Sequence, residues 1–154
     1  MPIPINMYYK LALRGLISIV LGVSYGLLCG ALTFLIWRLT HDPAYPGPLI
    51  PDQNGWGRIV TLATAVTTGF CAAVVAWIVA LTNAGKARGG VIGFVFGLVV
   101  FLFLSAPELV SLLKFSNHEV LSELGRLGIS LLFLPIGLAT IGLIASVLTS
   151  SIKR

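Results

Sequence analysis

Four long apolar segments dominate the sequence and restrict what the chain can fold into. They cover residues 15–37, 59–81, 89–106 and 127–152, and none of them contains Asp, Glu, Lys, Arg or His. A helix that crosses the hydrocarbon core of a bilayer needs about 20 predominantly apolar residues. Inside lipid, a helix also satisfies all its own backbone hydrogen bonds. The sequence therefore predicts an all-α membrane protein with four transmembrane helices in a single domain, residues 1–154.

The low charge content supports this prediction. Only 10% of the residues are charged and the mean hydropathy is +1.01, whereas a soluble domain carries about 25% charged residues. A net charge of +5 would suggest nucleic acid as a partner for a soluble protein. Here the basic residues sit at the ends of the apolar segments, so we expect contact with membrane lipids and no nucleic-acid partner.

The charges that flank the four segments predict the topology. The N-terminal segment, residues 82–88 and the C-terminus contain six basic residues and no acid, whereas all five acids fall in the two longer connections. Basic residues accumulate on the cytoplasmic side of a membrane. We therefore expect two hairpins with both termini cytoplasmic, in a bacterial inner membrane or an equivalent energy-transducing membrane. The six basic residues are Lys10, Arg14, Lys86, Arg88, Lys153 and Arg154.

The N-terminal region has some features of a secretory signal sequence. Lys10 and Arg14 precede the apolar residues 16–28, which matches the charged and apolar regions of such a signal. The apolar run continues through residues 31–37, however, and so has the length of a full membrane span. We expect a retained helix.

The two longer connections carry different patterns. Residues 38–58 contain four prolines within nine residues, which predicts a stiff, extended outer loop. In the second connection, residues 107–126, Ser-x-x-Glu occurs at 105–108 and again at 116–119, and this pattern is typical of a helix start. We expect two short amphipathic helices at the membrane interface there, with Pro107 kinking or ending the third span.

Small residues recur every four positions in all four apolar segments. In lipid the hydrophobic effect does not drive helices together, so association depends on close approach of the backbones. The spacing predicts glycine-zipper packing, either within this bundle, which we favour, or against a helix of another protein. The residues are Ser18, Gly22, Gly26 and Gly30; Ala65, Gly69 and Ala73; Gly89, Gly93 and Gly97; and Gly142, Ser146 and Ser150.

Hydroxyls and thiols supply the polarity inside the predicted spans. Thr61, Thr64 and Thr68 share one face of the second helix, and Tyr25 lies near the middle of the first. Hydroxyls in transmembrane helices commonly bond to backbone carbonyls or across helices, and we expect Tyr25 to bond a threonine across the bundle. The alternative is a path for a polar solute along the threonine face. We expect Cys29 and Cys71 to act as small buried apolar residues.

The two histidines are the only residues that could ligate a pigment or haem, and both lie outside the spans. His41 precedes Asp42 and His118 precedes Glu119, which is a weak pattern for a metal or ligand site. We predict no metal site and no cofactor; pigment, haem or lipid would enter only in an energy-transducing complex. The sequence contains no nucleophile–base pair or phosphate loop, so we expect no enzyme.

These observations lead to a hypothesis about function. We interpret the chain as a non-catalytic accessory or structural subunit of a larger integral membrane complex, such as a respiratory or photosynthetic one. Its partners would be other integral membrane subunits and lipids. Two alternatives stay open: a homo-oligomeric channel or transporter for a neutral or weakly polar solute, and a pigment- or haem-binding subunit with His41 as ligand.

Overall fold

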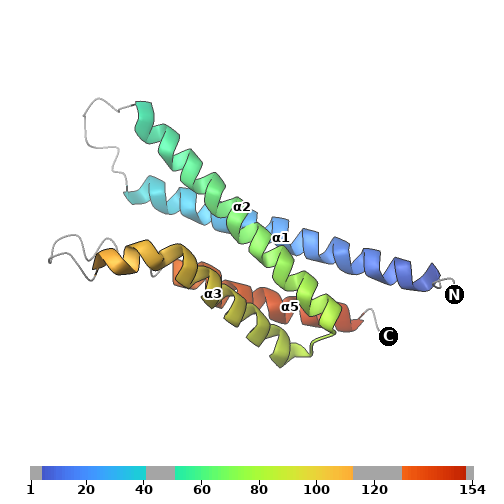
Figure 1. Cartoon of the computed structure of the whole chain (residues 1–154). Coiled ribbons are helices and arrows are strands. Elements are labelled where there is room, and N and C mark those ends of the chain that lie inside the picture. Colours follow the sequence, from blue (N-terminus) through green and yellow to red (C-terminus); the bar gives the residue numbers. More distant parts are fainter. Residues whose placement is uncertain (1–4, 41–50, 113–129, 152–154) are drawn as a thin grey trace.

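The computed structural model describes residues 5–40, 51–112 and 130–151, and every element in these ranges is helical. Helix α1 is followed by α2 and then by α3. A short π-helix, η1, leads directly into the last helix, α5 (Figure 1). The bounds are Ile5–Thr40 for α1, Pro51–Thr82 for α2, Lys86–Leu112 for α3, Leu132–Ile136 for η1 and Gly137–Ser151 for α5.

Four helical stretches are long and apolar enough to cross a membrane. By length and composition these are Met7–Ile36, Ile59–Thr82, Lys86–Ala106 and Leu132–Ser151, the last of which includes η1. This finding confirms the predicted all-helical chain with four candidate membrane spans. Four such helices are consistent with an integral membrane protein.

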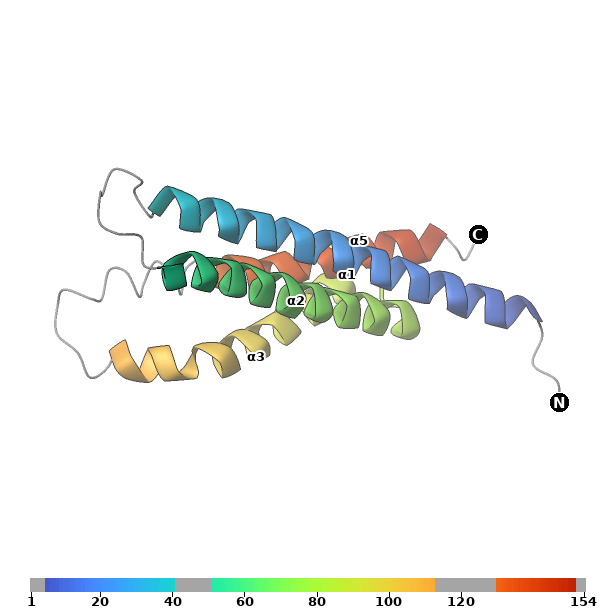
Figure 2. The ribbon, with the colours of Figure 1, turned by 90° about the horizontal axis from the view of Figure 1, so that it is seen from above.

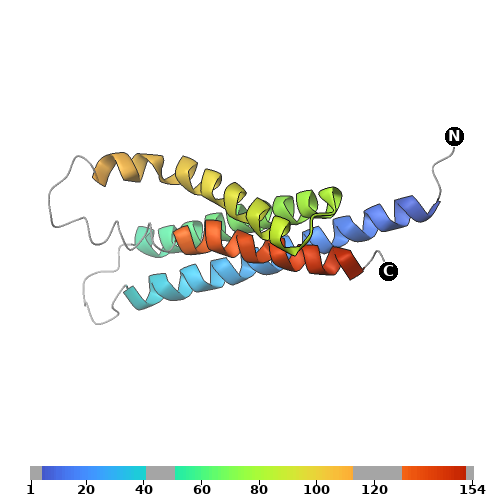
Figure 3. The ribbon, with the colours of Figure 1, turned by 90° about the horizontal axis from the view of Figure 1, so that it is seen from below.

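The helices pair as two hairpins. Helix α1 crosses α2 and packs on it most extensively, and α3 packs on α5 together with η1. The two hairpins meet mainly between α2 and α5. Figures 2 and 3 show that the C-terminal half of α3 leans away from the other helices. In that half the side chain of Phe103 is 81% exposed, so a large apolar face is left uncovered.

The start of α1, the α2–α3 turn and the end of α5 lie at the same end of the bundle (Figure 1). This arrangement follows from an even number of spans joined in sequence. The turn is tight because Asn83 has a φ of 50° and the Ala84 N–H donates to the carbonyl of Val79 at 3.3 Å, which closes α2 in the manner of a Schellman motif. Which side of a membrane this end faces stays a prediction.

Helix α1 is longer than its apolar segment. It begins at Ile5 rather than near residue 15 and comprises 36 residues, which corresponds to about 54 Å at 1.5 Å per residue. A bilayer core is about 30 Å thick, so part of the helix extends beyond it. Lys10 and Arg14 therefore lie on the same continuous helix as the apolar segment.

The first long connection differs from its prediction at both ends. Residues 38–40 belong to α1 and residues 51–58 belong to α2, so the expected extended loop over 38–58 is wrong for these positions. Pro51 is the first residue of α2. Proline suits the first turn of a helix, where its missing N–H would have no intrahelical partner. Residues 41–50, including His41, lie outside the described residues.

The third helix also corrects a prediction. Helix α3 runs through Pro107 to Leu112, so Pro107 does not end it and residues 105–108 do not start a separate short helix. Ser105 is instead a buried residue within the helix, 3% exposed. Membrane helices tolerate proline because neighbouring groups satisfy the freed carbonyl. The second expected short helix, at 116–119, falls in residues 113–129, outside the described residues.

The core lies where α2 and α5 face each other. Leu138 and Ala145 of α5 and Val75 and Val79 of α2 are all 0% exposed, and they belong to one buried cluster. Many other large apolar side chains of the described helices are exposed. In a bilayer these side chains face lipid or other proteins.

We expect Leu138→Ala to lower the free energy of unfolding by about 2 kcal/mol, because the buried side chain would leave a cavity that its neighbours fill only in part. Leu148, 40% exposed on the same helix, provides the matched control. Leu148→Ala should cost less than about 1 kcal/mol. Unfolding by SDS titration in mixed micelles measures both, and equal costs would contradict the position of the core.

Candidate functional site

The closest approach of α1 and α2 occurs at glycine. A Cβ placed on Gly26 would lie 2.9 Å from the Cα of Gly69 and would also run into the carbonyl oxygen of Ala65. Both obstacles are backbone atoms, which cannot move aside as a flexible side chain can. Gly26 and Gly69 therefore let the two backbones touch directly.

The rest of the small-residue ladder of α1 faces the same partner. A Cβ on Gly22 would lie 2.7 Å from the Cβ of Ala73, and one on Gly30 would lie 2.8 Å from the Cβ of Ala65. Ser18, one turn earlier, is 3% exposed, and its hydroxyl donates to the Arg14 carbonyl at 2.9 Å. The structure thus places Gly22, Gly26 and Gly30 against α2, and it buries Ser18 on the same helix.

The same arrangement occurs between α3 and α5. A Cβ on Gly89 would lie 2.5 Å from the carbonyl oxygen of Gly142 and 3.0 Å from the Cβ of Ser146. A Cβ on Gly93 would lie 3.0 Å from the Cα of Ala139. Ser146 is 2% exposed and donates to the carbonyl of Leu143 at 2.7 Å. These residues bring α3 and α5 into backbone contact.

Gly97 meets a different segment. A Cβ at this position would lie 2.7 Å from the carbonyl carbon of Leu134 and 2.8 Å from the Cα of Pro135. Both atoms belong to η1. The third glycine of the α3 ladder therefore accommodates the irregular backbone that precedes α5.

The threonine face of α2 is turned partly toward α1. Thr68 is 4% exposed, and its hydroxyl donates to the Thr64 carbonyl one turn earlier at 2.7 Å. Thr64 and Thr61 are half-buried. The bond made by Thr68 is the local backbone bond that threonine commonly makes in a helix.

Tyr25 connects the two hairpins. Its hydroxyl donates to the backbone carbonyl of Phe133 in η1, so the expectation that it would bond a threonine is wrong. A Cβ on Gly137 would lie 2.7 Å from the Cζ of Tyr25 and would overlap its hydroxyl oxygen. Only glycine at residue 137 leaves room for the tyrosine ring to reach its acceptor.

The irregular backbone of η1 explains why this carbonyl is engaged by a side chain. Pro135 lies inside η1 and has no N–H to donate, and the Gly137 N–H, which would bond to the Phe133 carbonyl in an α-helix, donates to the carbonyls of Leu132 and Leu134 instead. Shifts of this kind mark π-helices, which often occur at functional positions. The sequence signal was Pro135 within an apolar span, but nothing in the sequence connects it to Tyr25.

The two cysteines are free thiols in the packed part of the bundle. Cys29 is 1% exposed and Cys71 is 6% exposed. The Cys29 thiol interacts with the hydroxyls of Tyr25 and Thr68. Tyr25, Cys29, Thr68 and the Phe133 carbonyl thus form one uncharged polar cluster where α1, α2 and η1 meet. Hydroxyls in lipid contribute to helix association through such bonds.

One open groove flanks the α1–α2 crossing. Its volume is about 390 Å³, and Gly22, Gly26 and Gly69 lie among the residues that line it. Large apolar side chains surround the glycines, among them Val66, 63% exposed, and Phe70, 70% exposed. This glycine groove is apolar and opens outward.

The structure does not bear on the histidine hypothesis, because His41 and His118 both lie outside the described residues. Within residues 5–40, 51–112 and 130–151, no group of three or more His, Cys, Asp or Glu residues could hold a metal ion.

Comparison with protein-family models, with curated proteins and with solved structures found no match to this chain.

We expect Gly26→Ala to destabilise the bundle by about 1–3 kcal/mol, because the added methyl group would force the α1 and α2 backbones apart. Gly85→Ala is the control, since nothing lies within 4 Å of a Cβ at that position and its φ is not positive. SDS titration of both variants measures the difference. A Gly26→Ala protein as stable as Gly85→Ala would refute the backbone contact.

We expect Tyr25→Phe to lower the free energy of unfolding by about 0.6 to 1.7 kcal/mol, the range measured for interhelical hydrogen bonds in membranes. The ring is retained, so the change isolates the hydroxyl that donates to Phe133. Tyr9→Phe, at a position 68% exposed, should leave stability unchanged. Equal effects of the two substitutions would argue against a structural bond at Tyr25.

Proposed function

We propose that this protein is a non-catalytic accessory subunit of a larger integral membrane assembly. The observation that carries the proposal is the glycine groove beside the α1–α2 crossing, lined by Gly22, Gly26 and Gly69 with large exposed apolar side chains around them. The occupant is a transmembrane helix of another subunit. Dispersion contacts are a main source of helix affinity in lipid, and a helix that packs on the exposed Val66 and Phe70 side chains would lie against both α1 and α2.

Two further features of the spans favour a structural role over transport. Asp, Glu, Lys, Arg and His are all missing from the four apolar segments, whereas transporters and pumps commonly use an ionisable residue within the membrane. The Thr68 hydroxyl, on the face considered for a solute path, is buried and bonds to its own helix. The hydroxyls of Tyr25 and Thr68 thus serve helix packing.

The proposal includes glycine-zipper packing within each hairpin. The ladders of α1 and α3 meet the backbones of α2 and α5, so each hairpin is a close-packed unit before any partner binds. A preorganised pair of helices loses little conformational freedom on association. The outer side of the α1–α2 hairpin is then the surface on which a partner helix packs.

We also propose that both termini face the cytoplasm. Lys10, Arg14, Lys86 and Arg88 belong to the α1 start and the α3 start, which lie at one end of the bundle in Figure 1. Basic residues concentrate on the cytoplasmic side of membrane proteins. The partner helix in the glycine groove would cross the same membrane.

The test uses a wide side chain at the edge of the groove. Val66 lines it and is 63% exposed, so Val66→Trp leaves the contact between α1 and α2 intact and fills the space outside it. We expect the wild-type chain, extracted in mild detergent, to migrate on a native gel with other integral membrane subunits identified by mass spectrometry. Val66→Trp should reduce this co-migration at least about tenfold, a loss of about 1.4 kcal/mol.

Val99→Trp is the matched control, because Val99 is 61% exposed, lies on α3 and does not line the groove. This variant should co-migrate as the wild type does. Migration of the wild type solely as a free monomer would refute the subunit proposal, and equal behaviour of the two variants would refute the groove as the contact. A homo-oligomer that conducts a neutral solute in liposomes would establish the channel alternative instead.

A further inference from the structure

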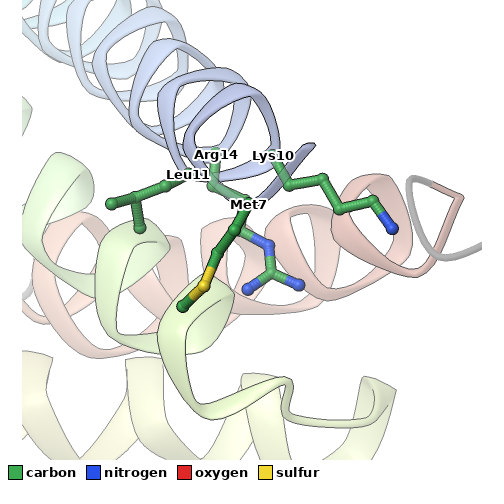
Figure 4. A pocket seen from close by; sticks show the side chains of 4 residues that line it. All are labelled: Met7, Lys10, Leu11 and Arg14. Atoms are coloured by element: carbon green, nitrogen blue, oxygen red, sulfur yellow. The ribbon is translucent and has the colours of Figure 1, made fainter. Parts of the chain in front are cut away.

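A second groove lies near the N-terminal end of α1. Its volume is about 330 Å³, and it is lined by Met7, Lys10, Leu11 and Arg14. Figure 4 shows Met7 and Arg14 extending to the same side of α1, with Lys10 and Leu11 to either side of them. Two basic and two apolar side chains from consecutive turns of one helix thus line this groove, the basic groove.

Arg14 is held in place at one end of its side chain and has an unused donor. Its Nη2 donates to the Oδ1 of Asn83 at 2.8 Å, across the turn between α2 and α3. Its Nε is shielded from solvent and has no hydrogen-bond partner among the described residues. Buried donors in proteins are usually paired with a protein group, a water or an ion. The Asn83 bond fixes the orientation of the guanidinium, which belongs to a side chain that lines the basic groove.

The charge around the basic groove is positive. Lys10 and Arg14 lie one helical turn apart. The two acids on the described helices, Asp52 and Glu108, belong to the start of α2 and the end of α3, at the opposite end of the bundle (Figure 1). Arg14 also marks the boundary of the first apolar segment, since residues 15–37 contain no charge. The groove therefore lies at the depth where lipid headgroups begin, with an excess of positive charge.

The basic groove also has an apolar lining, which a ligand with an apolar part would contact. Met7 is 62% exposed and Leu11 is 44% exposed, and both line the same cavity as the two cations. Tyr8 and Tyr9, on adjacent positions of α1, are also exposed, and tyrosine concentrates at the membrane–water interface. A free phosphate ion would use the cations alone, whereas a phospholipid would use the apolar side chains as well.

From these observations we propose that the basic groove binds the phosphate group of an anionic phospholipid. The Arg14 guanidinium, positioned by Asn83, donates to the phosphate oxygens, and the Lys10 ammonium supplies a second positive charge. Arginine and phosphate form strong charge-assisted hydrogen bonds. Met7 and Leu11 contact the glycerol backbone and the upper acyl chain.

Native mass spectrometry of the full chain in detergent, titrated with phosphatidylglycerol or phosphatidylcholine, tests this proposal. We expect phosphatidylglycerol to bind at least about fivefold more tightly than phosphatidylcholine. Lys10→Gln and Arg14→Gln should each weaken the phosphatidylglycerol affinity about fivefold, the effect expected for one cation at an anionic surface. Lys10 is exposed, so its substitution leaves folding intact even if Arg14→Gln alters the turn at Asn83.

Lys86→Gln and Arg88→Gln are the matched controls, since both residues are exposed cations at the start of α3 and neither lines the basic groove. They should change the affinity less than about twofold. Equal losses in the controls and in Lys10→Gln would overturn the proposal in favour of diffuse charge attraction. Equal binding of the two lipids would overturn it too, as would complete displacement of phosphatidylglycerol by millimolar inorganic phosphate.

Discussion

Close contact between helix backbones is the interaction on which the rest of this structure depends. Lipid is as apolar as leucine, so burying leucine against another helix gains little, and dispersion contacts together with hydrogen bonds must hold the helices. The chain meets this constraint with glycine at the crossing points: Gly26 meets the Gly69 backbone, and Gly89 meets that of Gly142. Each hairpin contains such a contact between its two helices.

The uncharged polar cluster joins the hairpins where glycine contacts do not. Tyr25 reaches from α1 to the Phe133 carbonyl, and Gly137 provides the space that its ring requires. The Leu138 and Val75 side chains fill the adjacent core between α5 and α2. Irregular backbone within a membrane is tolerated only where protein groups satisfy it. Pro135 and Tyr25 therefore depend on one another, the first by disturbing the helix and the second by binding a carbonyl of the disturbed turn.

The surfaces left over after this packing suit two kinds of neighbour. The glycine groove is apolar and lies beside the α1–α2 crossing, with Val66 among its lining residues, which suits a second transmembrane helix. The basic groove lies near the N-terminal end of α1, and its Lys10 and Arg14 suit a lipid phosphate. These surfaces use different chemistry at different places on α1. A subunit that binds a partner helix and a lipid headgroup would be fixed both laterally and in depth.

The sequence by itself determined the number of helices long and apolar enough to span a membrane, and the small-residue ladders, because apolar length and four-residue spacing are local properties of a chain. The sequence patterns did not locate the ends of α1, α2 and α3. Charged residues before residue 15 and up to residue 58, and the proline at residue 107, suggest boundaries, but they do not prevent a helix from continuing. Only the tertiary structure decided which backbone each ladder meets, that Tyr25 binds Phe133, and that Arg14 reaches Asn83 across 69 residues. Such contacts join segments distant in sequence, and they depend on crossing angles and on a π-helical turn that no local pattern specifies.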